Sequence, residues 1–293
     1  MKETGGRGVR RSRRYALNGA TTGAADLLTD LRVARDAGYG AVEIRDTKLE
    51  AYLDGGGSLP DLRQAFREAG VQPLSMNAVE RATLAVGAAR AAVLGRCGTL
   101  SAWAEALGCP YVVAVPGAAD GTNAAAIRHA SAEVLRELAI IARDHGVRIG
   151  FEFLGFRDCS VNTLAAAQAI VEEVGDPSVG LVIDAFHYYV GGSTWSMLEG
   201  LDPRSLFIVH VDDAEDRPRE TLTDAHRLLP GEGVMPLQEM LGRLTAIGYE
   251  GFYSVELFRP EYWTWDPLAL ARAARERLDA LFAGVEAAGG GGR

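Results

Sequence analysis

Short β-rich apolar runs alternate with helical segments eight times along this chain, and this alternation limits the folds open to it. The run Val179-Gly-Leu-Val-Ile has no polar alternation, as expected of a strand buried on both faces. Several helical segments end at a glycine, such as Gly70 or Gly108, which favours the left-handed conformation at helix ends. Eight strand–helix units predict a (β/α)8 TIM barrel rather than an open doubly wound sheet. The strands are expected at residues 15–18, 41–45, 71–77, 111–115, 148–153, 179–184, 206–211 and 251–257.

The composition is that of one globular domain with a sizeable core. Hydrophobic residues make up 48% of the 293 residues and charged residues 24%, and no linker-like tract interrupts the middle of the chain. We therefore expect residues 15–286 to form one barrel domain. Residues 1–14 contain a dense basic run, which favours a disordered tail, with a basic docking arm as the alternative. Residues 287–293 are expected to be a flexible glycine-rich tail.

Charge and hydropathy exclude several classes of partner. The net charge of -9 opposes nucleic-acid binding, and no apolar segment is long enough to span a membrane. No apolar stretch follows the basic run, so a secretory signal is not expected. The three cysteines form no Cys-x-x-Cys pair. These features predict a cytoplasmic protein whose partner is a small molecule, and a homo-oligomer is compatible with them.

Metal-capable side chains lie in or at the end of the last four expected strands. In a TIM barrel the active site lies at the carboxyl ends of the strands, so side chains from four consecutive strands can meet there. A salt-bridged carboxylate or a packed histidine would explain any one of them, but four such residues in apolar runs favour a metal site. Three carboxylates and one imidazole suit one divalent ion, foremost Mn²⁺ or Zn²⁺, with Co²⁺ or Mg²⁺ as alternatives. The expected metal ligands are Glu152, Asp184, His210 and Glu256.

Three further residues are candidates for contacts with a substrate. Asp212 follows His210 by two positions, so both side chains point to the same side of their strand, and Asp212 either binds substrate or orients a neighbouring group. Asp213 points the other way and is interpreted as structural. His187, in the loop expected after the sixth strand, can donate a hydrogen bond to a substrate oxygen or be a loop residue without function. Arg227, in a long polar loop, can neutralise an oxyanion.

The chain resembles the sugar isomerase/epimerase superfamily of xylose-isomerase-like barrels, and within it the inosose (2-keto-myo-inositol) isomerases of inositol catabolism. The resemblance implies the four metal ligands above, with His187 and Arg227 at the substrate. It runs from about Ala16 onward, and the last matching stretch is the most specific. The matching stretches are Asn18-Gly-Ala-Thr-Thr, Val42-Glu-Ile-Arg, Tyr111-Val-Val-Ala-Val-Pro, Phe151-Glu-Phe, Cys159-Ser-Val-Asn-Thr, residues 179–187, His210-Val-Asp-Asp, residues 227–233 and Ser254-Val-Glu-Leu-Phe-Arg-Pro-Glu-Tyr.

The resemblance and the candidate residues together imply proton transfer through a cis-enediolate of a cyclic polyol ketone. Glu152 or Glu256 would take the proton from the hydroxyl-bearing carbon, with His187 or Arg227 stabilising the charge. A ketose 3-epimerase would use the same ligands, and a dehydratase would eliminate a hydroxyl from the same intermediate. A DNA-cleaving barrel of the endonuclease IV type needs a site richer in histidine than a chain with five histidines offers. A metal-free sugar-binding module would need none of the carboxylates.

Overall fold

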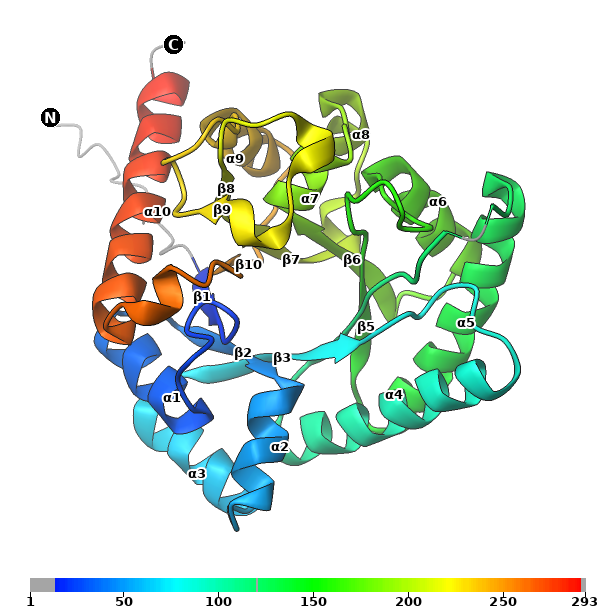
Figure 1. The fold of residues 1–293 in the computed structure, drawn as a ribbon, viewed down its shortest axis with the longest axis horizontal. Helices are drawn as coiled ribbons and strands as arrows, with labels where there is room; N and C mark the ends of the chain where they lie inside the picture. The colour runs from blue at the N-terminus through cyan, green and yellow to red at the C-terminus, as the bar shows by residue number, and fades with distance from the viewer. Residues whose placement is uncertain (1–13, 120, 291–293) are drawn as a thin grey trace, which may run out of the picture.

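A closed barrel of eight parallel strands, surrounded by helices, is seen in the computed structural model, which describes residues 14–119 and 121–290 (Figure 1). Around the barrel the order is β1-β10-β7-β6-β5-β4-β3-β2. The predicted (β/α)8 TIM barrel is therefore confirmed. The barrel strands are β1 (Arg14–Asn18), β2 (Ala41–Arg45), β3 (Gln72–Val79), β4 (Tyr111–Ala114), β5 (Arg148–Glu152), β6 (Val179–Asp184), β7 (Leu206–Val211) and β10 (Phe252–Val255).

Helices cover the outside of the barrel, and their ends follow local capping signals. Helix α6, for example, begins after Thr163, whose hydroxyl accepts a hydrogen bond from the Ala166 N–H, and ends at Gly175 with φ of 68°. The helices are α1 (Leu27–Asp36), α2 (Asp46–Asp54), α3 (Leu59–Ala69), α4 (Gly87–Leu107), α5 (Ala124–Asp144), α6 (Leu164–Val174), α7 (Ala185–Val190), α8 (Trp195–Glu199), α9 (Leu237–Ala246) and α10 (Pro267–Gly290). No helix within the described residues is both long and apolar enough to cross a membrane.

Three features differ from the sequence-based expectations. Helix α7 occupies a segment that we expected to be a loop, α2 was not among the expected helices, and β8 (Asp213–Ala214) pairs with β9 (Arg227–Leu228). Helix α10 continues to Gly290, so the first part of the predicted 287–293 tail is helical, and residues 291–293 lie outside the described part. Of the predicted basic tail, residues 1–13 also lie outside it, whereas Arg14 begins β1.

The barrel interior changes from apolar to polar along the strands. Near the amino ends, a cluster of buried apolar side chains fills the barrel, among them Ala41, Ile208 and Phe252. Inward-facing positions recur every second residue of a strand. The next inward positions on these strands are therefore Glu43, His210 and Ser254, and all of these side chains are buried. The apolar layer thus forms the floor beneath a polar site at the carboxyl ends.

Candidate metal centre and active site

The four predicted metal ligands converge at the carboxyl end of the barrel. Glu152 and Asp184 are the last residues of β5 and β6, His210 lies near the end of β7, and Glu256 directly follows β10. These strands are consecutive in the barrel, and Asp184 and His210 are register partners. One ligand atom from each of the four residues lies within 4.8 Å of the others. The geometry therefore places the four candidates around a single point.

His210 holds the centre of this cluster. Its Nδ1 atom is 3.1 Å from Glu152 Oε1, 3.2 Å from Glu256 Oε2 and 3.8 Å from Asp184 Oδ2. Burial lowers the pKa of His210, but the surrounding glutamates outweigh this effect and raise it well above its usual value. Three buried carboxylates need nearby positive charge. Their convergence with one imidazole nitrogen is the donor set expected of a site for Mn²⁺ or Zn²⁺, so the residues present fit a divalent ion.

The carboxyl groups of Glu152 and Asp184 have different pKa values because their surroundings differ. Burial raises the pKa of Glu152 to about 7, despite the hydrogen bond with His210. Burial also opposes ionisation of Asp184, but Arg227, His187 and His210 outweigh it and lower its pKa to about 2. Glu152 therefore exchanges a proton near neutral pH in the metal-free protein, whereas Asp184 stays ionised.

Arg227 is a buried cation beside the cluster. Its Nη1 atom donates to Asp184 Oδ2 at 2.5 Å and to Asp212 Oδ2 at 2.6 Å, and its side chain is 1% exposed. Asp212 also accepts a hydrogen bond from the Phe186 N–H at 3.1 Å. Among the described residues, Asp212 does not belong to the wall of the cavity over the cluster. Of the two roles expected of Asp212, these hydrogen bonds match the orientation of neighbouring groups, Arg227 and the start of α7, while substrate binding stays a prediction.

His187 lies on α7 rather than in a loop, and Asp184 sets its position. The Asp184 carboxylate caps the helix by accepting a hydrogen bond from the His187 N–H at 2.8 Å. Arg227 Nη2 lies 3.2 Å from His187 Nε2 and can only donate, so the imidazole proton is on Nδ1. Burial lowers the pKa of His187, which favours the neutral ring. Its Nδ1 is buried and has no hydrogen-bond partner among the described residues, so it is available to donate to a ligand.

A cavity of about 220 Å³ lies over the cluster, with Glu152, His187, Arg227 and Glu256 in its wall. All four residues predicted to be catalytic therefore face the same space. Other residues complete the wall, including Arg45, Asn77, Glu80, Leu154, Phe156 and Phe258. The mixture of apolar surface and convergent polar groups is typical of a small-molecule site.

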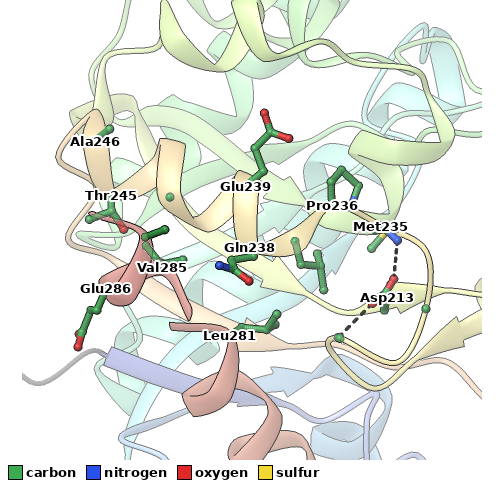
Figure 2. Close-up of a pocket in the computed structure, with 15 residues that line it drawn as sticks. Asp213, Met235, Pro236, Gln238, Glu239, Thr245, Ala246, Leu281, Val285 and Glu286 are labelled. Carbon is green, nitrogen blue, oxygen red and sulfur yellow. Dashed lines mark hydrogen bonds between the residues drawn. The ribbon is translucent and has the colours of Figure 1, made fainter. Parts of the chain in front are cut away.

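A larger cavity of about 930 Å³ lies on the outside of the barrel, between α9 and the end of α10 (Figure 2). Asp213 borders this outer cavity and accepts hydrogen bonds from the Gly231 and Met235 N–H groups, which supports its predicted structural role. Glu239 contributes a carboxylate on α9, but none of the four clustered ligands belongs to the wall. Two of the clustered ligands, Glu152 and Glu256, line the smaller cavity instead.

Sequence reasoning missed a second polar layer directly beneath the ligands. Glu43, on β2 across the barrel from β7, is fully buried and binds His210. Burial raises the pKa of Glu43, but His210, Ser254 and Ser75 outweigh this effect and lower it to about 2. Asn18 donates to both Glu43 and Glu256. A carboxylate inside the apolar run Ala41-Val-Glu-Ile is the same signal that identified Glu152, and it would have revealed Glu43.

Known proteins resemble this chain over most of its length. Residues 31–281 match the family described as xylose isomerase-like TIM barrel. An inosose isomerase of Halalkalibacterium halodurans is 40% identical over 241 residues, which cover 82% of this chain and 85% of the relative. An inosose isomerase of Bacillus velezensis is 38% identical over 259 residues, or 88% of this chain and 92% of the relative.

A solved structure extends the likeness to three dimensions. The crystal structure of the IolI protein with a bound zinc atom has a TM-score of 0.89 and 35% sequence identity to this chain. The match covers 92% of this chain and 98% of that protein. With such coverage in sequence and structure, this chain belongs to the xylose isomerase-like TIM barrel family.

Proposed function

We propose that this protein is a metal-dependent isomerase that moves the ketone of a cyclic polyol by one carbon. The substrate class is an inosose of the 2-keto-myo-inositol type or a related sugar ketone. The observation that carries the proposal is the convergence of two glutamates with Asp184 and His210 around one point beneath a small cavity. Its support from relatives is the identity of up to 40% with proteins named inosose isomerase.

Glu152, Asp184, His210 and Glu256 would hold the ion, which when bound acts as a Lewis acid on a carbonyl. Zn²⁺ or Mn²⁺ suits this donor set, and the bound zinc atom of IolI supports Zn²⁺ as the first ion to test. Arg227 keeps Asp184 ionised and correctly oriented through its 2.5 Å hydrogen bond.

Glu152 and Glu256 carry the proton transfer, because both carboxylates lie in the cavity wall. One of them removes the proton from the hydroxyl-bearing carbon, and the C–H electron pair becomes the double bond of an enediolate. A proton then returns to the former carbonyl carbon, and the former carbonyl oxygen takes up the proton that the neighbouring hydroxyl oxygen loses as the new carbonyl forms. No atom is gained or lost overall, so the ketone and the hydroxyl exchange places.

His187 supports this step from the side of the cavity. Its Nδ1–H, without a partner in the described part of the chain, is a donor for a substrate oxygen that becomes negative during enediolate formation. The hydrogen bond from Arg227 to Nε2 keeps the proton on Nδ1. The Phe156 ring packs in a T-shaped arrangement with the imidazole, with centroids 5.0 Å apart, and limits its rotation.

The proposal is tested by incubating the metal-loaded enzyme with an inosose in D₂O and following the products by NMR. The expected product has the ketone on the neighbouring carbon, deuterium at the carbon that received the proton, and no loss of water. Inversion at a single carbon would instead identify an epimerase, and an unsaturated product a dehydratase. Absence of any reaction with inososes and ketohexoses, with the metal shown to be bound, would refute the isomerase.

A pair of matched variants locates the reaction in the smaller cavity. Glu256→Gln should suppress deuterium exchange, with metal content measured on the same sample. Glu239→Gln makes the same chemical change at the outer cavity between α9 and α10, where the carboxylate pairs with Arg243. Turnover and KM should be unchanged in Glu239→Gln. If turnover were lost in Glu239→Gln and not in Glu256→Gln, the substrate would bind in the outer cavity and the proposed location would be wrong.

A further inference from the structure

Glu43 lies on the far side of the His210 ring from the metal-ligand cluster. The imidazole Nε2 atom is 3.1 Å from Glu43 Oε1 and 3.3 Å from Oε2, whereas Nδ1 faces Glu152, Glu256 and Asp184. When it is ionised, the Glu43 carboxylate has no proton to donate and acts only as a hydrogen-bond acceptor. The ring is thus held between one acceptor below and three carboxylates above.

We propose that Glu43 is a positioning residue for the metal centre: by accepting the Nε2–H of His210 it keeps the Nδ1 lone pair directed at the ion. This inference rests on the metal site of the proposed function, but not on the identity of the substrate. A histidine that binds a metal through one nitrogen commonly donates its other N–H to a carboxylate, which fixes the tautomer and strengthens the ligand. The geometry assigns that task here to a residue of β2, the strand across the barrel from β7.

The surroundings of Glu43 hold its carboxylate in one orientation. Ser254 Oγ donates to Oε1 at 2.5 Å, and Ser75 Oγ donates to Oε2 at 2.6 Å. Glu43 and His210 are both completely buried, so water does not compete for these hydrogen bonds. Five side chains, from β1, β3, β7 and β10, therefore converge on the Glu43 carboxylate: Asn18, Ser75, Asn77, His210 and Ser254.

Asn18 connects this carboxylate to a second ligand. Its amide nitrogen lies 3.2 Å from Glu43 Oε1 and 2.9 Å from Glu256 Oε1. The Ala20 N–H donates to the Asn18 amide oxygen at 2.9 Å, which determines which end of the amide is the donor. Asn18 thus supports Glu256 in the same way that Glu43 supports His210, and a buried layer from four strands backs two of the four ligands.

The first test needs no mutation. In the Zn²⁺-loaded wild-type protein, ¹⁵N NMR should show His210 protonated at Nε2 and metal-bound at Nδ1. The opposite tautomer, with the metal on Nε2, would overturn the proposal. This measurement uses no substrate, so it stays informative even when the isomerase assignment fails.

The second test measures Zn²⁺ affinity by competition with a chromophoric chelator. Glu43→Gln keeps the size of the side chain but removes the charge, and should weaken Zn²⁺ binding by roughly 10–100-fold. Glu43→Asp keeps the carboxylate and should recover part of this loss. Ser75→Ala removes a different hydrogen bond to Glu43 without touching His210, and should weaken binding less than Glu43→Gln does.

The variants also separate positioning from a purely structural role. In Glu43→Gln the ¹⁵N shifts of His210 should change, while those of the exposed His129 should not. A folded Glu43→Gln with wild-type Zn²⁺ affinity and unchanged His210 shifts would overturn the proposal. If Glu43→Gln does not fold, the wild-type tautomer and Glu43→Asp decide the question.

Discussion

Gly155 provides a test of how the fold positions His187. Gly155 is buried against the backbone of α7. A Cβ atom at this position would lie 2.4 Å from the carbonyl oxygen of His187 and 2.7 Å from the backbone nitrogen of Gly191. Ordinary contacts of this kind begin at 3.4 Å, so Gly155→Ala requires a displacement of about 1 Å. Since both neighbours are backbone atoms, no side-chain rotation relieves the clash.

The expected consequences follow from that displacement. Overpacking of a buried site costs roughly 1–3 kcal/mol of unfolding free energy. The carbonyl oxygen of His187 also accepts the Gly191 N–H at 3.0 Å, so the added methyl group would intrude on the end of α7. A misplacement of about 1 Å at a group that positions substrate costs on the order of 10²-fold in turnover. Metal content should be retained, because all four ligands lie on or next to barrel strands.

Chemical denaturation, steady-state kinetics with an inosose and elemental analysis measure these three quantities. Gly95→Ala is the matched control, since Gly95 is exposed within α4 and no atom of residues 14–119 or 121–290 comes within 4 Å of its added Cβ. That variant should be more stable than the wild type by about 0.5–1 kcal/mol, because alanine favours a helix more than glycine does. Wild-type stability and turnover in Gly155→Ala would refute the described packing of this loop on α7.

Three further predictions concern charge and metal. Arg227→Met leaves Asp184 and Asp212 without their shared cation. Chemical denaturation should show a fall in unfolding free energy of roughly 3–5 kcal/mol, and steady-state kinetics a loss of turnover of about 10²–10³-fold. Chelation should abolish turnover and added Zn²⁺ or Mn²⁺ should restore it; full turnover in a sample shown to be metal-free by elemental analysis would contradict this. Burial raises the pKa of Asp30 to about 6, from an ordinary 3.8, although Lys48 Nζ donates to it at 2.7 Å. The native carboxyl therefore keeps a proton that the unfolded chain releases, and this stabilisation, at most about 3 kcal/mol, should be lost as the pH rises from about 4 to 6. Denaturation across that range should show the loss in the wild type and not in Asp30→Asn.

Local sequence patterns were sufficient to predict the barrel and the four clustered side chains. Strands buried on both faces appear as apolar runs, and eight strand–helix units close into a barrel with all carboxyl ends at one side. A carboxylate or imidazole in such a run is costly without a partner, so Glu152, Asp184, His210 and Glu256 were identifiable one strand at a time. The parallel topology then required these four positions to meet.

Helix α7 illustrates a local feature that the pattern did not reveal. It has only six residues, too few for an apolar period to be recognised. Its first turn depends on Asp184, which caps the helix, and on Asp212, which accepts the Phe186 N–H. The helix therefore forms where two strand ends supply acceptors. Predicting it would have required knowing how the Asp184 and Asp212 carboxylates lie relative to each other.

The partners of the buried polar groups were decided by tertiary structure alone. Arg227 was expected to neutralise an oxyanion, which stays a prediction, and only the structure shows that its Nη1 atom also pairs with Asp184 and Asp212. Glu43 and His210 are 167 positions apart in the chain, yet they form a buried pair across the barrel. Hydrogen bonds depend on distances of a few tenths of an ångström and on which nitrogen or oxygen faces the partner. The alternation of a strand tells which side chains point inward, but closure of the barrel determines which of them touch.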